Sequence, residues 1–350
     1  MDGDGEQRSE RGRHADVDSP LTGLDITRIV TDGDLDGVMT AAILRRYWPD
    51  AEVVFGHPGA LRAGLLDDVI DARTAVCDLP AHPAAGLLID HHETNRPVSD
   101  PTADASGPVI IWRPTQSAAR IAHDEVSGTV DCSDLSEAME WVDRLDGGSI
   151  TRQQYLSDHP MVRIARLVDG DAMPEVARAV LRGFERGDSP ERLLQHPAIA
   201  TADAERRAGR RLIHRIIDET AIIVERLAVV RFDGSGVRTN GYEITARIGD
   251  ACDACILVHG WLDGSMGDAE RPPVGASFYN NSFLHPDGGL ADLTLLATAI
   301  DPDGGGHRDA CGCRVKPLDD AGVVTERPLT VADLDANLDR WLTIWRSIRA

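Results

Sequence analysis

Residues 26–37 of the chain read ITRIVTDGDLDG. The first six of these residues, apolar or β-branched for the most part, predict a short buried strand from Ile26 to Thr31. The run that follows, Val38 to Tyr47, predicts a helix. Between them lies a turn in which three aspartates, at positions 32, 34 and 36, alternate with glycine and leucine. A strand, an acidic turn and a helix in this order indicate the first unit of an α/β fold.

The alternation of strands and helices continues along the chain. Further strands are predicted at Glu52–Phe55, Thr74–Cys77, Leu87–Ile89 and Val109–Trp112, with helices at Gln116–Val126 and Ser136–Leu145. This pattern predicts a mostly parallel sheet with flanking helices. Ligands of such sheets bind at the carboxyl ends of the strands.

The second half of the chain predicts a different organisation. Residues 161–195 have a helical pattern with breaks, and Ala202–Leu227 has a long helical pattern. Short strands, Gly-rich turns and a final helix at Val331–Ile348 follow. We therefore expect a disordered tail (1–22), a first domain (23–200), a connecting helix (201–227) and a smaller α/β domain (228–350).

The composition limits the class of protein. The 350 residues are 42% hydrophobic, enough for a core, and their net charge is −22. Lys316 is the only lysine, and such an acidic, lysine-poor surface favours a halophilic source, although GC-rich coding gives the same arginine bias. The charge disfavours long-range attraction of a phosphate chain, which leaves that task to local groups and metals. The sequence contains no apolar run of about 18 residues and no secretory signal, so we expect a cytoplasmic protein.

The acidic turn has two interpretations on its own. Asp32 and Asp34 can converge on a divalent ion, because glycine allows the backbone to curl and carboxylate oxygens suit Mg²⁺ or Mn²⁺. A polar turn that caps the helix, with Asp36 as the N-cap residue, is the alternative.

Two further motifs follow predicted strands and favour the metal site. Asp78 follows Thr74–Cys77, and the triplet Asp90-His91-His92 follows Leu87–Ile89. One imidazole can bind a metal while the next meets a substrate phosphate, and Asp90 can orient a ring through its second nitrogen. Three such motifs at one sheet edge can hold two metals about 3.5–4 Å apart, and mixed carboxylate and imidazole ligands suit Mn²⁺.

At this point the chain resembles the DHH phosphoesterase family. It has the Asp-x-Asp motif at Asp32 and Asp34, the lone Asp78 and the Asp90-His91-His92 triplet in the family's order. Near the other end, the run from Gly304 to Gly312 reads GGGHRDACG and resembles the signature of the DHH-associated C-terminal domain.

The resemblance implies roles for individual residues. Asp78 would bridge two metals and His92 would contact the scissile phosphate, with Asp90 beside it. The implied metal ligands are Asp32, Asp34, Asp78, His91 and an aspartate of a fourth motif, for which we prefer Asp143 and keep Asp146 as the alternative. The implied phosphate-binding residues of the second domain are Gly305, Gly306, His307 and Arg308, and physically a Gly-rich loop lets backbone N–H groups approach phosphate.

One departure from the family concerns Arg28. Many members with small substrates carry a histidine ligand four residues before the first aspartate, and Arg28 stands there instead. The acidic run resembles the version in RecJ-type exonucleases, yet the chain is short and lacks an aromatic and basic stripe for tracking a single strand.

We therefore expect an Mn²⁺-dependent hydrolase for short nucleotide or oligonucleotide phosphoesters, which can act as a homodimer. The alternatives are a non-catalytic RecJ-like replication partner and a polyphosphate or pyrophosphate hydrolase. Cysteines 252, 255, 311 and 313 can in principle form a zinc site, but buried small residues also explain them.

Overall fold

The computed structural model describes residues 19–97, 107–168, 174–266, 268, 270–319 and 321–349. The predicted N-terminal tail lies outside these residues up to position 18. The chain divides into two compact units, of which the first comprises Met1–Ser149 and Ile164–Ile199 and the second Ile150–Arg163 and Ala200–Ala350. Within the described ranges, no helix has the length and apolar character needed to cross a membrane.

The first unit is built on a five-stranded sheet with the order β2-β1-β3-β4-β5. Every pairing in it is parallel, which confirms the predicted fold class. The strands are β1 (Arg28–Asp32), β2 (Glu52–Gly56), β3 (Thr74–Cys77), β4 (Leu87–Asp90) and β5 (Val109–Trp112). The chain leaves β1 to one side for β2 and returns to the other side for β3, so the order of strands reverses between β1 and β3. Ligands bind at such a reversal, outside the carboxyl ends of the strands.

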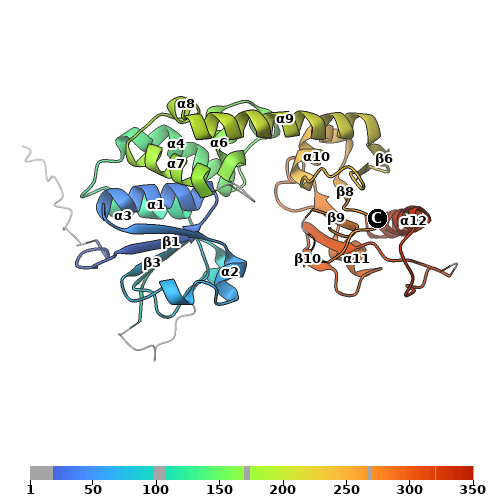
Figure 1. The fold of residues 1–350 in the computed structure, drawn as a ribbon, viewed down its shortest axis with the longest axis horizontal. Helices are drawn as coiled ribbons and strands as arrows, with labels where there is room; N and C mark the ends of the chain where they lie inside the picture. Colours follow the sequence, from blue (N-terminus) through green and yellow to red (C-terminus); the bar gives the residue numbers. More distant parts are fainter. Residues whose placement is uncertain are drawn as a thin grey trace, which may run out of the picture. The chain divides into compact units, whose positions relative to one another are not determined.

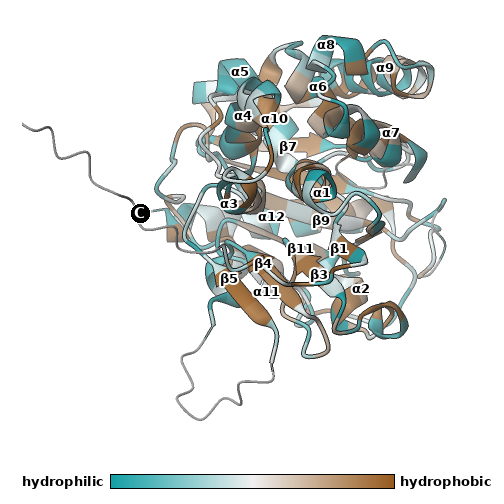
Figure 2. Cartoon of the chain, turned by 90° about the vertical axis from the view of Figure 1, so that its left-hand side faces the viewer, coloured by the Kyte–Doolittle hydropathy of each residue, from teal (hydrophilic) through white to brown (hydrophobic). Residues whose placement is uncertain are grey.

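Helices cover both faces of this sheet (Figure 1). The helices α1 (Leu35–Tyr47), α3 (Ala118–Val126), α4 (Ser136–Asp146) and α7 (Pro174–Glu185) lie together on one face. The short helix α2 (Pro58–Arg62) lies on the other, where Val30, Val76 and Leu88 form one row of a buried cluster. Figure 2 shows the resulting contrast, with hydrophobic colours along the strands and mixed colours on the helices.

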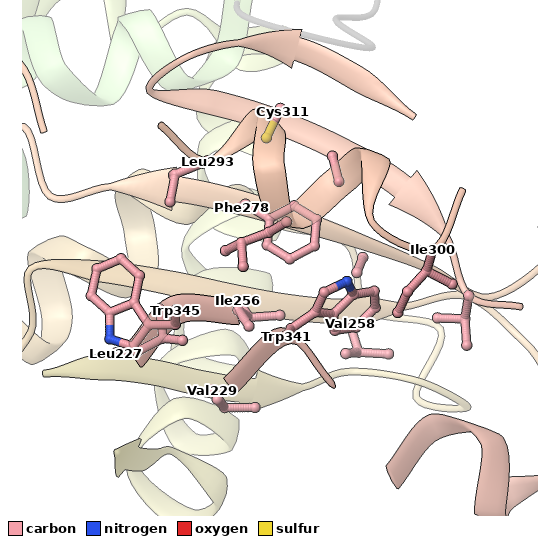
Figure 3. Close-up of a cluster of buried hydrophobic side chains, with 14 of the residues drawn as sticks. Leu227, Val229, Ile256, Val258, Phe278, Leu293, Ile300, Cys311, Trp341 and Trp345 are labelled. Atoms are coloured by element: carbon pink, nitrogen blue, oxygen red, sulfur yellow. The ribbon is translucent and has the colours of Figure 1, made fainter. Parts of the chain in front are cut away.

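The second unit is built on a six-stranded mixed sheet with the order β10-β11-β9-β8-β7-β6. Its strands are β6 (Ile222–Val224), β7 (Leu227–Arg231), β8 (Ala254–His259), β9 (Gly275–Asn280), β10 (Gly305–His307) and β11 (Ala310–Arg314). On one face, α10 (Gly241–Ile248) covers a cluster that includes Cys252, Cys255 and Ile244. On the other, α11 (Thr294–Thr298) and α12 (Val331–Ile348) enclose Phe278, Cys311, Trp341 and Trp345 (Figure 3).

The remaining helices are α5 (Arg152–Leu156), α6 (Pro160–Val168), α8 (Pro190–Leu193) and α9 (Pro197–Thr220). The expectation that one helix continues to Leu227 is wrong, because α9 ends at Thr220 and Ile222–Val224 forms strand β6. A two-residue turn, Glu225-Arg226, joins β6 to its antiparallel neighbour β7, with φ values of 48° and 64°. Two positive φ values are typical of the type I′ hairpin turn, which glycine or asparagine usually occupies, so the sequence carried no familiar signal for it.

The four cysteines considered for zinc lie on opposite faces of the second sheet. Cys252 and Cys255 belong to the cluster under α10, whereas Cys311 and Cys313 pack with the cluster under α12. Burial raises the pKa of the Cys255 thiol well above its usual value and that of Cys311 to about 12. The arrangement excludes a shared four-thiolate site, and the cysteines act as small core residues.

Candidate metal centre

The three acidic motifs meet at one edge of the first sheet. The residues Thr31, Cys77 and Ile89 lie in one row across β1, β3 and β4. Asp32, Asp78 and Asp90 each follow the residue of that row in their own segment, so all three lie just beyond the row at the carboxyl edge. The predicted convergence of these motifs is therefore present in the structure, and Asp32 and Asp78 flank the strand reversal.

A close backbone approach shapes the Asp32–Gly37 turn. A Cβ atom at Gly37 would lie 2.1 Å from the Asp32 carbonyl oxygen, so only glycine fits there. Asp34 is the N-cap residue of α1, and its Oδ1 accepts a hydrogen bond from Gly37 N at 2.9 Å. The suggestion that Asp36 caps this helix is wrong.

Asp36 instead holds the start of another helix. Its side chain is buried, and its two oxygens accept hydrogen bonds from Ala118 N at 2.7 Å and Ala119 N at 2.8 Å, in the first turn of α3. The N-terminus of a helix stabilises a carboxylate in this position. Asp36 thereby ties α3 to the acidic turn.

Asp78 has the most constrained backbone of the cluster. Its φ is 55°, in the left-handed region that a non-glycine residue seldom adopts. Its backbone N–H donates to Ile89 O at 2.9 Å, and its residue surface is 3% exposed. This conformation turns the carboxylate out of the strand, where Oδ1 lies 3.7 Å from His91 Nε2 and 3.6 Å from His92 Nδ1.

His91 presents one ring nitrogen to the acidic cluster. Its Nδ1 lies 3.3 Å from the Thr115 carbonyl oxygen, to which it can donate its proton. A hydrogen bond of this kind leaves the other nitrogen unprotonated, with its lone pair available to a metal, as in most histidine metal ligands. That nitrogen, Nε2, lies 3.7 Å from Asp36 Oδ2 and 3.0 Å from Asp146 Oδ2.

Asp90 organises the histidine pair. Its Oδ1 accepts hydrogen bonds from His91 N at 2.8 Å and His92 N at 3.1 Å, and it lies 2.9 Å from His92 Nδ1. Burial alone would raise the pKa of Asp90, but the hydrogen bonds with His92 outweigh it and lower that pKa. The same contact raises the pKa of His92. The ring of His92 is half-exposed, and Nε2 is the nitrogen that does not contact Asp90.

The fourth motif contributes Asp146 to this cluster, not the preferred Asp143. Asp143 accepts hydrogen bonds from Ser117 Oγ at 2.7 Å and Arg120 Nε at 3.0 Å, which occupies both of its oxygens. The two aspartates are three residues apart on α4, and only Asp146, its last residue, lies against His91.

Carboxylates crowd together in this cluster. Burial, followed by the charges of Asp36 and Asp34, raises the pKa of Asp78 well above its ordinary value. Burial likewise raises the pKa of Asp34 to about 6 and that of Asp36 well above its ordinary value, and burial also raises that of Asp32. Burial lowers the pKa of His91, but the carboxylates of Asp146 and Asp36 outweigh it and raise that pKa to about 9. Burial is the main cause of the raised aspartate pKa values, and neighbouring carboxylates add to it at Asp34, Asp36 and Asp78.

The donor set fits a divalent cation. Asp78 Oδ1, His91 Nε2 and Asp146 Oδ2 are buried atoms that make no well-aligned hydrogen bond within the described residues. Two groups of three side chains each offer one potential metal-binding atom per residue, and within each group these atoms lie within 4.8 Å of one another. The groups are Asp36, His91 and Asp146, and Asp78, His91 and His92. Buried polar atoms without partners are costly, and a bound ion satisfies them.

Arg28 does not lie at this edge. It is the first residue of β1, where its Nε lies 3.2 Å from Glu52 Oε2 and its guanidinium donates to Val69 O at 2.7 Å. Four residues of extended strand span about 13 Å, so the position of the family's additional histidine is at the opposite end of this strand.

The Gly-rich motif forms an exposed edge of the second sheet. Gly305 and Gly306, with φ values of 159° and 138°, begin β10, and His307 pairs with Ala310 across a two-residue turn. A Cβ at Gly306 would lie 2.8 Å from the Ala310 carbonyl oxygen, so glycine is required there. Arg308, in the turn, donates to Gly289 O at 3.1 Å. The loop is therefore a fixed, exposed backbone edge beside one histidine and one arginine.

Sequence reasoning missed two members of the first cluster. Asp36 was named only as the N-cap residue in the alternative interpretation of the turn, and the carbonyl of Thr115, which orients His91, was not considered. The spacing of the acidic turn offered a signal for Asp36, because it is the third of three alternating aspartates. No sequence pattern identifies a backbone carbonyl from another segment.

Solved structures with a similar fold exist for this chain. No model of a protein family matches the sequence, and no curated protein matches it significantly. The pGpG-specific phosphodiesterase PggH of Vibrio cholerae is similar over 92% of this chain and 99% of its own, with 21% identity and a TM-score of 0.72. RecJ of Thermus thermophilus, solved with Mn²⁺, matches 92% of this chain and 52% of its own, with 14% identity and a TM-score of 0.44. The sequence motifs and the architecture agree, and the chain has the fold of the DHH phosphoesterases.

Proposed function

We propose that the protein is an Mn²⁺-dependent hydrolase that cleaves phosphoester bonds in short nucleotide substrates. One observation carries the proposal: at the carboxyl edge of a parallel sheet, the buried atoms Asp78 Oδ1 and Asp146 Oδ2 lie 3.7 Å and 3.0 Å from His91 Nε2, and none of the three makes a well-aligned hydrogen bond within the described residues. Ligand sites of such sheets lie at this edge.

The ligand set of the proposal contains carboxylates and one imidazole. Asp32, Asp34, Asp78, His91 and Asp146 would hold two divalent ions, with Asp78 shared between them. Asp36 is left out of the ligand set, because both of its oxygens accept hydrogen bonds from the first turn of α3. It positions that helix beside the proposed ligands. Divalent ions in such a site polarise a phosphoryl oxygen and lower the pKa of a bound water.

His92 and Asp90 act on the substrate side of the proposal. Asp90 accepts a hydrogen bond from His92 Nδ1 and raises the pKa of that ring, which favours the protonated imidazole, and the protonated ring can donate from Nε2 to a phosphate oxygen. We also propose that Gly305, Gly306, His307 and Arg308 bind a substrate phosphate, since backbone N–H groups and an arginine suit that ligand.

Short substrates fit the charge of the chain. A net charge of −22 opposes a long polyanion, whereas metals and a local loop can hold one or two phosphates. Similarity in fold to a pGpG-specific phosphodiesterase supports a linear dinucleotide as the first substrate to test.

The test is a product screen with metal-stripped protein reloaded with Mn²⁺ or Mg²⁺. The panel contains pGpG, other linear dinucleotides, short oligoribonucleotides, nucleotide 3′-phosphates and polyphosphate, each at low and high salt. We expect mononucleotide release that requires the metal and is strongest with dinucleotides. No product from any substrate would overturn the proposal, and a failure to bind metal would favour a non-catalytic role instead.

A further inference from the structure

A row of side chains crosses the second sheet beside the Gly-rich loop. His307 pairs with Ala310, Ala310 with Tyr279, and Tyr279 with Cys255. Residues directly opposite one another in antiparallel strands point to the same face. Cys255 belongs to the cluster under α10, so His307 and Tyr279 lie on the α10 face. The neighbouring Phe278 and Cys311 lie on the opposite face, under α12 (Figure 3).

An aromatic pair includes Tyr279, the third residue of this row. The rings of Tyr279 and Tyr242, which belongs to α10, meet edge to face with centroids 5.5 Å apart. Tyr279 is held tightly, because a Cβ at Gly241 would lie 2.2 Å from its ring. Tyr242 is 42% exposed and is the only aromatic among the exposed large hydrophobic residues of the described chain. A packed ring thus supports an exposed one.

The residues between the aromatic pair and His307 are small. Ala310 separates Tyr279 from His307, and the next row on the same face consists of Gly305, Gly312 and Ser277. Two strand spacings place His307 roughly 10 Å from Tyr279 along the sheet, a span that one nucleotide covers from its phosphate to its base. Within these rows, no large side chain stands between Tyr279 and His307 on the α10 face.

We propose that Tyr242 and Tyr279 form a nucleobase-stacking site in the second unit, which holds the base of a nucleotide whose phosphate binds at the His307 loop. The inference rests on the proposed function, because it assigns the base-binding part of the same substrate. Stacking on aromatic rings tolerates any base and does not depend on positive charge, so it suits a chain with a net charge of −22.

Binding to the metal-free protein tests the site separately from hydrolysis. Guanosine 5′-monophosphate, adenosine 5′-monophosphate and ribose 5-phosphate are titrated calorimetrically into full-length protein in chelator. We expect both nucleotides to bind more tightly than ribose 5-phosphate, which lacks the base. Tyr242→Ala should weaken nucleotide binding about 5- to 150-fold, the range of one stacked base. It should leave ribose 5-phosphate binding unchanged.

Two further variants make the result specific. Tyr242→Phe keeps the ring and should bind nucleotides like the original protein, and Leu295→Ala removes an exposed apolar side chain from α11, under the opposite face, and should have no effect. Ala310→Val places a larger side chain between Tyr279 and His307 and should weaken nucleotide binding without removing either tyrosine.

Equal binding of nucleotide and ribose 5-phosphate, no binding of either, or unchanged nucleotide binding in Tyr242→Ala would overturn the stacking site. Base-dependent binding by a protein that releases no product with Mn²⁺ would overturn the proposed function and leave the stacking site standing.

Discussion

Buried aspartates occur in both units, with opposite surroundings. In the second unit, Asp301 pairs with Arg314 and Lys316, and Asp333 pairs with Arg327. In the first unit, Asp36, Asp78 and Asp146 gather around His91, with Asp34 beside Asp78, and the described residues place no arginine or lysine in an ion pair with them.

The pKa values of these carboxyl groups differ accordingly. Burial alone would raise the pKa of Asp301, but hydrogen bonds from Arg314 outweigh it and hold that pKa at about 2. Hydrogen bonds from Arg327 hold the pKa of Asp333 far below its ordinary value. Burial raises the pKa of Asp34 to about 6 instead. The carboxylates of Asp301 and Asp333 are paired with arginine, whereas among the described residues the first cluster contains no arginine or lysine partner, and the proposed function assigns that place to a divalent cation.

The largest effect is expected from Asp78→Asn, which tests whether the unpaired aspartates of the first unit serve metal binding and not folding. Asparagine keeps the shape and tolerates the left-handed backbone at φ 55°. If Asp78 is the shared ligand that we propose, its loss should remove several kcal/mol of transition-state stabilisation, about a thousandfold in rate, and reduce bound metal. The metal-free variant should be more stable by about 1 kcal/mol, because a buried, repelled carboxylate is gone. Steady-state rates, metal analysis and urea unfolding measure these effects, and a large loss of stability would show that the cluster is structural.

A matched pair of variants on α4 sharpens the assignment of the fourth motif. Asp146→Asn should weaken metal binding by more than about tenfold, because its oxygen faces His91 Nε2 at 3.0 Å. Asp143→Asn should leave metal affinity within about twofold, since its oxygens contact Ser117 and Arg120. Calorimetric titration of Mn²⁺ into both stripped variants compares them directly. The reverse order of affinities would restore Asp143 as the ligand.

Asp333→Asn tests whether the aspartates that pair with arginine in the second unit stabilise the fold. Asp333 accepts hydrogen bonds from Arg327, from Thr330 N and from Leu318 N, and completes the capping box of α12. Its loss should lower the free energy of unfolding by about 2 kcal/mol, as for a lost cap and charged hydrogen bond. Metal content and turnover at a temperature where the variant is folded should not change. Unaltered unfolding in urea would show that the pairing of Asp333 with Arg327 does not stabilise the fold.

The smallest expected effect is a pH dependence that comes from Asp301. Its pKa is about 2 in the folded chain against 3.8 for the free group, so its contribution is complete above pH 4 and is lost as the pH falls towards 2. The difference corresponds to about 2 kcal/mol. Urea unfolding at pH 5 and pH 3 should show a smaller decrease in Asp301→Asn than in the original protein. Identical decreases would mean that Asp301 is not specially stabilised.

The strands and the motifs at their ends were predictable because they depend on local patterns. Each strand of the first sheet is a short apolar run that ends at an aspartate or a turn, and β3, β5 and α12 have the predicted bounds. The end of α9 was not predictable in the same way. Ile222 and Ile223 continue a helical pattern, but pairing with β7 through the Glu225-Arg226 turn makes them a strand.

The sequence by itself determined which kinds of side chain stand at the ends of the strands, since strand period and turn chemistry are encoded within a few residues. Tertiary structure decided which of them meet. Asp143 and Asp146 are equivalent in the sequence, and the packing of α4 against its neighbours turns only Asp146 towards His91. The row from His307 to Tyr279 likewise exists only through strand register. The physical reason is the same in both cases: contacts between distant segments depend on helix packing and interstrand hydrogen bonds, which no local pattern specifies.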